Sequence, residues 1–398
     1  MSPSLTYKGV PVWRHTQVIQ WTTQFVSGIL VVVLVSWFAA NMINAVQDRE
    51  IPHGFSFLDR EYQTPIGQHF LPYESSDTFL YAFIVAATNT LIVSIAGVVL
   101  ATLLGTFIGI ARLSGNWIIS RIALIYVEFF RNVPLLVQLF FWFYIVLALP
   151  PVREGYVLAD RLYLNNAGLS IPWLSVSGLG SSLGWIGLVV VAIVAGIVVH
   201  RWLVIREIRR GSAPDPLLMG IATVFVIGAV GWLVIALSSG TAPFTVSLPS
   251  PHGAFGRISD GFTMSGGLMA LMLGLVIYTA SFIAEIVRAG IQSVSRGQIE
   301  AARALGLSNA RTLRQVTLPQ AMRVIVPPLI SQFLNLTKNS SLAGAIGFSD
   351  LTNVAKTMTQ TAPAVSIFLM IMAAYLAMSL TYSLIGNLYN KRISIERR

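Results

Sequence analysis

Residues 295–319 read SRGQIEAARALGLSNARTLRQVTLP, and the rest of the chain is organised around this polar stretch. It lies between two strongly apolar segments, 264–287 and 324–347, each of which is long enough to cross a lipid bilayer. Only a few residues separate the polar stretch from either apolar segment. The stretch is therefore predicted to hang from the ends of two membrane helices, at the surface of the membrane.

Within this stretch, the residues that begin and end helices are well placed. Ser295 followed three residues later by Gln298 is typical of a capping box, which predicts the start of a helix. Gly306 predicts the end of that helix, because glycine readily adopts the left-handed conformation that closes a helix. Ser308 predicts the start of a second short helix, which ends near Pro319, where the chain turns back toward the membrane. We therefore expect two short helices joined by a turn.

This pattern has two possible functional interpretations. With its three arginines, Arg303, Arg311 and Arg314, it resembles a helix-turn-helix that reads DNA. The short links to membrane spans, and the lack of a basic arm or a second copy, argue against nucleic acid. The favoured interpretation is a rigid lever on the cytoplasmic side that is presented to a soluble partner.

The composition indicates a membrane protein before any motif is considered. Of 398 residues, 55% are hydrophobic and only 11% are charged, whereas about a quarter of the residues of a soluble domain are charged. The mean hydropathy is +0.72. There is no cysteine, and the five histidines are scattered singly, so the sequence predicts no disulfide and no metal site.

Eight apolar segments are long enough to span a bilayer. The first is predicted to be a retained helix rather than a cleaved signal peptide, because it is long and lacks a clear cleavage site. The third is the least regular, since Arg131 and Pro134 lie near its start, and its membrane portion is expected to begin near Val133. We therefore predict an all-α integral membrane protein with about eight spans, at 25–43, 80–111, 125–150, 185–204, 217–238, 264–287, 324–347 and 365–388.

The basic residues predict the orientation of these spans. If residues 1–24 are cytoplasmic, the outer segments contain only Arg49, Arg60, Arg153, Arg161, Arg257 and Lys356 of the 26 lysines and arginines. Lys338 lies inside a span, and all the others are cytoplasmic. Both termini, including residues 391–398, and the 295–319 stretch are thus predicted to lie inside. The net charge of +10 then reflects contact with anionic lipids and cytoplasmic partners, not with nucleic acid.

Residues 44–79 are predicted to lie outside and contain most of the external acidic residues. One interpretation is a docking surface for a partner outside the cytoplasm. The favoured interpretation is a solvated loop with a short amphipathic helix along the membrane. Residues 151–184 are likewise expected to form an external loop.

The spacing in the polar stretch resembles the EAA signature of ABC-importer permeases, in which a loop couples the permease to its ATPase. The resemblance implies that the loop 288–323 docks into a groove of a cytoplasmic ATPase dimer. In that role, Glu300 would hold the first helix or pair with an ATPase cation, or else be a merely solvated charge. The two small alanines would permit close approach to the groove. The matching residues are Glu300, Ala301, Ala302, Gly306, Val316, Leu318 and Pro319.

A second stretch, VEFFRNVPLLVQ at 127–138, is similar to a motif of polar amino-acid permeases. The resemblance implies a type I ABC-importer (MetI-like) core of five helices, made by residues 80–150 and 263–390. Residues 25–79, with the first span, and residues 151–262, with two spans, are then additions typical of larger general amino-acid permeases. It also implies a bacterial inner-membrane location, a second permease chain, identical or homologous, and a periplasmic amino-acid-binding protein.

Polar residues inside the predicted spans are candidates for the substrate pathway, because they are costly in lipid unless they face a cavity or a partner. The segment NLTKNSSL at 335–342 also resembles a segment of amino-acid permeases. Lys338 could meet a substrate carboxylate, or it could extend outward from a merely structural helix contact. The other candidates are Asn89, Thr90 and Gln138, each more commonly a helix-to-helix hydrogen bonder, and Asn335, Thr337, Asn339 and Ser340.

The sequence contains no motif with which the chain would catalyse a reaction or hold a cofactor. It has no GxxxxGK[ST] loop for a nucleotide and no recognisable catalytic triad, so it is not expected to be an enzyme. ATP and magnesium are therefore expected on a separate ATPase subunit. The alternatives are a gradient-driven secondary transporter, which should show inverted repeats that are not evident here, and a membrane scaffold that recruits a cytoplasmic protein.

Overall fold

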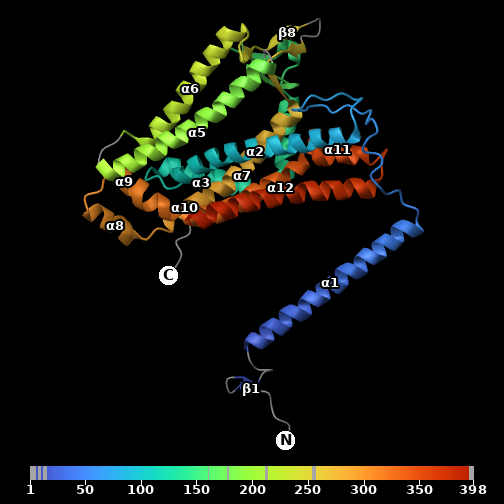
Figure 1. Ribbon diagram of the computed structural model, residues 1–398, viewed down its shortest axis with the longest axis horizontal. Helices are drawn as coiled ribbons and strands as arrows, with labels where there is room; N and C mark the ends of the chain where they lie inside the picture. Colours follow the sequence, from blue (N-terminus) through green and yellow to red (C-terminus); the bar gives the residue numbers. More distant parts are fainter. Residues whose placement is uncertain are drawn as a thin grey trace.

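The computed structural model describes residues 6–7, 10–11, 16–159, 161–176, 179–210, 214–252 and 257–393. Most of this part of the chain is helical, as Figure 1 shows. Much of the predicted cytoplasmic termini, including Lys8, Arg14, Arg397 and Arg398, lies outside the described residues.

Six of the described helices are long and apolar enough to cross a membrane, or seven if the bent pair α3 and α4 counts as one span. The segment 324–347, predicted as a further span, is not among them. It forms most of α10, whose polar residues lower its hydropathy, and continues as a 3₁₀ helix at Ser340–Ile346. The helices are α1 Thr16–Asp48, α2 Phe79–Ala111, α3 Trp117–Asn132, α4 Leu135–Leu147, α5 Leu179–Arg210, α6 Pro216–Ser239, α7 Gly266–Gln292, α8 Arg296–Ala304, α9 Asn309–Thr312, α10 Leu318–Asn339, α11 Leu351–Met358 and α12 Ala364–Ile393.

The predicted third span, 125–150, is divided by a sharp bend of 106° between α3 and α4. Val133 at the bend is in the extended conformation, with φ −94° and ψ 129°. It precedes Pro134, whose ring disfavours the helical conformation at the residue before it. The bend therefore occurs where the sequence indicated the irregular start of this span.

Helix α7 is the centre of the core, and α2, α3, α4 and α10 pack around it. Glycines permit the closest approaches. A Cβ at Gly105 of α2 would lie 2.7 Å from Cβ of Ile283, and one at Gly274 of α7 would lie 2.5 Å from Cδ2 of Leu139. Small residues at helix contacts are what close packing in a membrane requires, because lipid supplies little hydrophobic force between helices.

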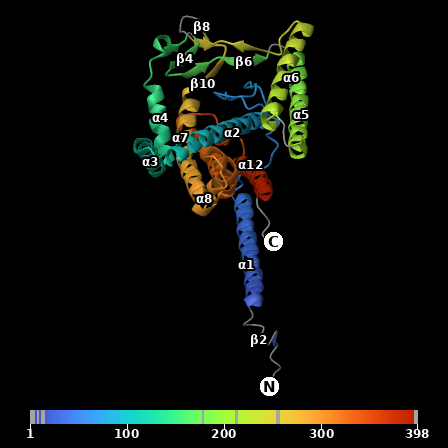
Figure 2. The same ribbon diagram turned by 90° about the vertical axis from the view of Figure 1, so that its left-hand side faces the viewer.

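Parts of the segments 156–176 and 244–265 form short antiparallel strands, so the loop expected at 151–184 contains regular structure in its first part. The strands make a layer between α4 and the α5–α6 hairpin in Figure 2. One sheet has the order β10-β5-β4-β3, and the others are pairs, β6 with β7 and β8 with β9. The strands are β3 Tyr156–Leu158, β4 Leu162–Asn165, β5 Gly168–Ile171, β6 Trp173–Val176, β7 Phe244–Ser247, β8 Ser250–His252, β9 Arg257–Ser259 and β10 Phe262–Ser265, besides the terminal pair β1 Thr6–Tyr7 and β2 Val10–Pro11.

The segment between α1 and α2 packs onto the core without forming a helix. Phe57, Tyr62 and Ile66 are buried in one cluster with residues of α2 and α11. The amphipathic helix expected in this segment is therefore absent from residues 49–78. By contrast, α1 has no buried residue and extends away from the other helices in both Figure 1 and Figure 2.

The contact between α2 and α7 can be tested with Gly105→Ala. The added methyl group meets Ile283 and the carbonyl of Ala280, at 2.8 Å, so we expect a loss of roughly 1–3 kcal/mol in stability. The control is Gly28→Ala in α1, where no atom lies within 4 Å. There the helix propensity of alanine should leave stability equal or improved. Thermal unfolding of the two purified variants measures the difference, and equal midpoints would contradict the close packing.

Candidate functional site

The predicted coupling stretch folds as a closed two-helix turn after α7. Gly306 follows α8 in the left-handed conformation, with φ +77°. Its N–H donates to the carbonyl of Arg303 at 2.9 Å, and the N–H of Leu307 donates to the carbonyl of Ala302 at 3.1 Å. These two bonds form a Schellman motif, in which the last carbonyls of the helix are satisfied.

The start of α8 differs from the predicted capping box. Ser295 is the N-cap residue, but its side chain makes no capping hydrogen bond. The N–H of Gln298 donates instead to the backbone carbonyl of Ser295 at 3.1 Å. Ser308 does cap α9, through an N–H···O bond from Arg311 at 3.5 Å. A π-helical segment, Leu313–Thr317, then leads directly into α10, with Pro319 in its first turn.

The structure separates the predicted coupling residues into an inner and an outer group. Glu300, Ala301 and Leu318 are exposed, whereas the side chain of Ala302 is only 4% exposed. Ala302 is thus one of the residues that hold the two short helices together. Leu305, which the sequence reasoning did not single out, is 83% exposed. Its only sequence signal is that it is a large apolar residue at the end of a polar helix.

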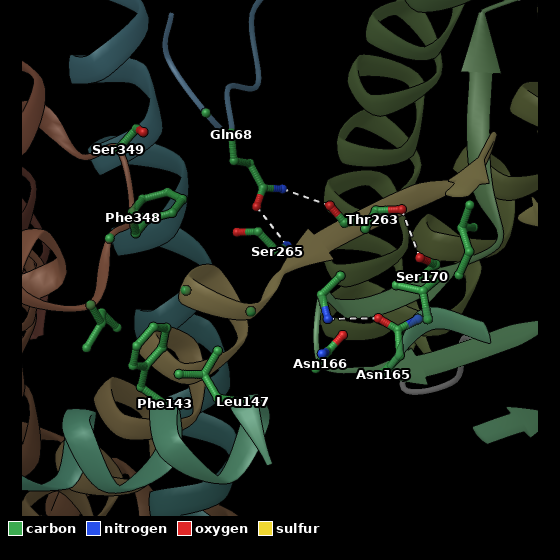
Figure 3. A pocket seen from close by; sticks show the side chains of 18 of the residues that line it. Gln68, Phe143, Leu147, Asn165, Asn166, Ser170, Thr263, Ser265, Phe348 and Ser349 are labelled. Atoms are coloured by element: carbon green, nitrogen blue, oxygen red, sulfur yellow. Dashed lines mark hydrogen bonds between the residues drawn. The ribbon is translucent and has the colours of Figure 1, made fainter. Parts of the chain in front are cut away.

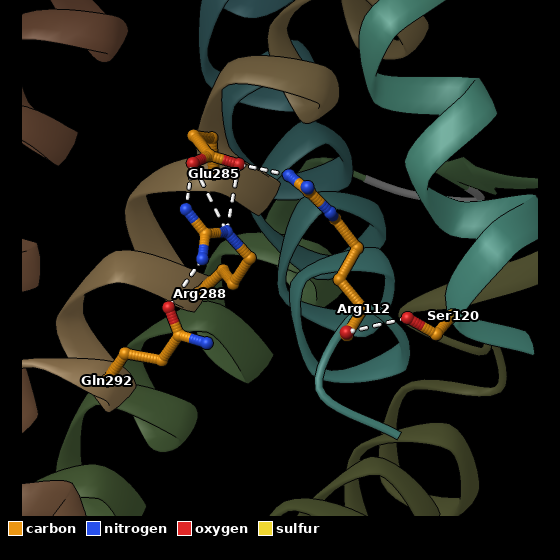
Figure 4. Close-up of polar contacts among 5 residues, drawn as sticks. All are labelled: Arg112, Ser120, Glu285, Arg288 and Gln292. Atoms are coloured by element: carbon orange, nitrogen blue, oxygen red, sulfur yellow. Dashed lines mark hydrogen bonds and ion pairs between the residues drawn. The ribbon is translucent and has the colours of Figure 1, made fainter. Parts of the chain in front are cut away.

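An ion-pair cluster lies just before this turn, near the end of α7 (Figure 4). The carboxylate of Glu285 pairs with the guanidinium of Arg288, as its i+3 spacing suggested, and also with that of Arg112. Arg112 follows the last residue of α2, and its carbonyl accepts a hydrogen bond from Ser120 of α3 at 3.0 Å. Glu285 therefore ties the end of α7 to the end of α2.

Asn89, a predicted pathway residue, is fully buried, and all of its hydrogen-bonding groups are used by backbone. Its amide nitrogen donates to the carbonyls of Gln68 at 2.9 Å and Ser349 at 2.8 Å. Its oxygen accepts from the N–H of Phe70 at 3.1 Å. Asn89 thus joins α2 to the segment before it and to the segment before α11, and it offers no free group to a solute.

Thr90 and Gln138 also make structural contacts. The hydroxyl of Thr90 accepts a hydrogen bond from the N–H of Leu351 at 2.9 Å. The amide nitrogen of Gln138 donates to the carbonyls of Phe130 and Val133, both at 2.9 Å, across the bend between α3 and α4. Gln138 therefore stabilises the corner that Pro134 creates.

The remaining pathway candidates lie on opposite faces of α10. Thr337 and Ser340 are buried, and their hydroxyls donate to the carbonyls of Phe333 and Thr337. Asn335 and Lys338 are exposed, and Asn339 is half-buried. Lys338 makes no ion pair with any residue of the described ranges. Of the predicted candidates, Asn335 and Lys338 are those that α10 presents outward.

A cavity of about 810 Å³, which the sequence reasoning missed, lies where the strand layer meets the core, and we call it the external cavity after the predicted orientation. Figure 3 shows Gln68 reaching across its wall, with its amide groups bonded to the N–H of Ser265 and the carbonyl of Thr263, both at 2.9 Å. The lining mixes apolar side chains with the amides and hydroxyls of Asn165, Asn166, Ser170, Thr263 and Ser349. The described lining residues include no acid, lysine or arginine.

Comparison with known proteins identifies relatives over nearly the whole chain. The family model "binding-protein-dependent transport system inner membrane component" matches residues 204–395. The putative amino-acid ABC transporter permease YhdX of Escherichia coli strain K12 is 42% identical, over 99% of this chain and 98% of its own. AapQ, a general L-amino acid transport system permease of Rhizobium johnstonii, is 40% identical over 94% and 92%. BztB, a glutamate/glutamine/aspartate/asparagine transport system permease of Rhodobacter capsulatus, is 38% identical over 95% and 94%.

The structural role of Asn89 predicts the effect of Asn89→Asp. The carboxylate cannot donate to the carbonyls of Gln68 and Ser349, so two buried acceptors lose their partner, at a cost of roughly 3 kcal/mol or more. The same change at exposed Asn335 should alter stability by less than about 0.5 kcal/mol. Thermal unfolding in detergent gives both values. If the two variants unfold at the same temperature, Asn89 does not have this role.

The buried carboxyl of Asp350, next to this network, predicts a pH dependence. Burial raises its pKa from 3.8 to about 6, although the N–H groups of Thr352 and Asn353 donate to it. The folded state therefore binds this proton more tightly than the unfolded state, and stability rises as the pH falls through 6. Between pH 7 and pH 5 the wild type should gain roughly 1 kcal/mol relative to Asp350→Asn. Parallel unfolding curves for the two proteins would contradict this.

Proposed function

The chain belongs to the family of amino-acid ABC transporter permeases, and from that membership we propose that it is the membrane subunit of an ATP-driven importer of polar L-amino acids. Proteins of this family are permease subunits rather than enzymes. The observation that carries the proposal is the closed turn after α7, with Glu300, Ala301 and Leu305 on its outer surface. Its surface combines these apolar side chains and one acid with several exposed arginines, and we propose that it fits a groove in a separate ATPase dimer, which would hold the ATP and magnesium.

The contacts around the turn support its role as a lever. At its start, Glu285 connects α7 to α2 through Arg112. At its end, the π-helical segment continues into α10 without a flexible link. A displacement of α8 would therefore move α7, α2 and α10 together. ATP-driven closure of the ATPase dimer would thus shift the spans between inward-open and outward-open arrangements.

The exposed face of α10 supports a second permease chain. Ser331, Asn335 and Lys338 are exposed at spacings of four and three residues, which places them on one face of the helix. Such residues are costly against lipid. A second permease chain, identical or homologous, would cover this face and leave a polar pathway between the chains. There the ammonium group of Lys338 could meet the carboxylate of an amino acid.

The external cavity supports the choice of substrate class. Its amide and hydroxyl groups can hydrogen-bond a polar solute, while its lack of charged groups in the described lining imposes no preference for one sign of charge. AapQ and BztB carry names that include general, acidic and amide amino acids. We propose a location in the bacterial inner membrane with both termini inside, so that this cavity faces a periplasmic amino-acid-binding protein.

The energy source provides a direct test of the proposal. The chain, its ATPase and its binding protein are reconstituted in proteoliposomes, and glutamine uptake is followed. Uptake should stop when ATP is omitted and continue when a protonophore collapses the proton gradient. Uptake that needs the gradient and not ATP would identify a secondary transporter, and ATPase binding without any uptake would identify a scaffold.

The lever is tested by Gly306→Val compared with Gly297→Val. A Cβ has open space at both positions, but only Gly306 has a positive φ, which a β-branched residue adopts at a cost of roughly 1–3 kcal/mol. We expect Gly306→Val to insert normally but to lower ATP-dependent uptake and stimulated ATPase activity about tenfold or more. Gly297→Val should retain most of both. Normal transport by Gly306→Val would rule out a role for this turn in coupling.

A further inference from the structure

A second cavity, of about 550 Å³, lies beside the coupling turn at the opposite end of the molecule from the strand layer. One wall is formed by the end of α5 and the start of α6, which belong to the added block 151–262. The other wall is formed by α9 and the π-helical segment, and Figure 1 shows α9 next to the end of α5. Two segments about a hundred residues apart in the sequence therefore share one cavity.

The two walls carry opposite charges. Glu207 and Asp215 line the side of the hairpin, and Arg311 and Arg314 line the side of the coupling turn. No ion pair within 4 Å joins any of these four groups in the described structure. Asp215 also caps α6, accepting from the N–H of Leu217 at 3.0 Å. The acids and the guanidinium groups therefore line opposite walls of the cavity without forming a salt bridge among these described residues.

An apolar groove continues from this cavity along the hairpin. It has a volume of about 240 Å³, lies between α5 and α6, and shares His200 and Leu217 with the charged cavity. The hairpin is tightly packed here, because a Cβ at Gly220 would lie 3.0 Å from the carbonyl of Gly196. A ligand with a charged head and an apolar tail would thus find a place for both parts.

We infer that the charged cavity binds a zwitterion, a ligand that carries a primary ammonium and an anionic group. The ammonium would donate to Glu207 and Asp215, and the anionic group would accept from Arg311 and Arg314. Charge-assisted bonds of this kind are the stronger hydrogen bonds in proteins, and the volume falls in the range of about 300–1,000 Å³ typical of small-molecule sites. Two sources have this chemistry: a free amino acid on that side of the membrane, and the head group of an aminophospholipid whose acyl chain lies in the apolar groove.

Such a ligand would join the added hairpin to the coupling turn. Its binding would restrain α9 and the π-helical segment relative to α5 and α6. An effect on ATPase coupling follows only if the turn is the lever of the proposed function, whereas the binding itself does not depend on that role. A binding measurement on the permease alone therefore separates a failure of this inference from a failure of the proposed function.

The experiment uses the full chain in phosphatidylcholine nanodiscs, where the lipid head group has no N–H donor. Binding of L-glutamine is measured by calorimetry, and retention of phosphatidylethanolamine is measured by native mass spectrometry. The variants are Glu207→Gln and Arg314→Gln, one from each wall. The control is Arg296→Gln, which removes an exposed arginine of α8 that does not line the cavity.

We expect one of the two ligands to bind the wild type and the Arg296→Gln control equally. Each wall variant should weaken that binding about tenfold or more, the loss expected for one charge-assisted hydrogen bond. Glutamine binding with this pattern identifies a free amino acid as the ligand, and phosphatidylethanolamine retention identifies the lipid. The inference is overturned if neither ligand binds, if binding persists in both wall variants, or if phosphatidylglycerol, which lacks an ammonium group, is retained equally well.

Discussion

The structure depends above all on the need to satisfy every polar group that is removed from water, since an unpaired one inside a membrane protein costs several kcal/mol. Asn89 and Glu285 meet this need by joining one helix to a neighbouring segment, and the amide nitrogen of Gln138 does the same, although the side-chain oxygen of Gln138 is buried without a partner among the described residues. Gln138 lies in the first turn of α4 and Glu285 lies toward the end of α7, whereas Asn89 lies within α2. Polar side chains in the spans therefore stabilise contacts within this fold more often than they offer groups for binding a solute.

The two-helix turn after α7 and the course of most of the main helices could be predicted from sequence, because both depend on local pattern. Gly306 adopts the left-handed conformation that its place after a helical segment indicated, and the bend between α3 and α4 lies at Pro134, near the position where the sequence indicated an irregular start to the span. The partners of Asn89 could not be predicted. They are backbone carbonyls of Gln68 and Ser349, the latter 260 residues away. Every residue has a backbone carbonyl, so the sequence does not indicate which carbonyls will accept these bonds. The short strands were missed for a related reason, since β5 pairs with the distant β10.

The exposed residues of α10 are the exception to this structural use of polarity. Asn335 and Lys338 have the residue types that a pathway needs, yet in a single chain they face outward. The same requirement that explains Asn89 then implies that something other than lipid covers this face. Buried polar residues of one chain thus indicate how that chain folds. Polar residues exposed on its membrane-facing surface indicate how it assembles with other chains.

Residues 151–262 reach both ends of the helical core, and this geometry argues against a passive role. Their strand layer lines the larger cavity through Ser170 and Asn165, and the tip of the α5–α6 hairpin lines the cavity beside Arg311. Helices α5 and α6 join the two places, and Trp185 of α5 bonds the carbonyl of Gly228 in α6 at 3.0 Å. Two close-packed helices transmit displacement along their length far better than a loop does. A movement of the turn after α7 would therefore be transmitted through α5 and α6 to the cavity that Gln68 lines.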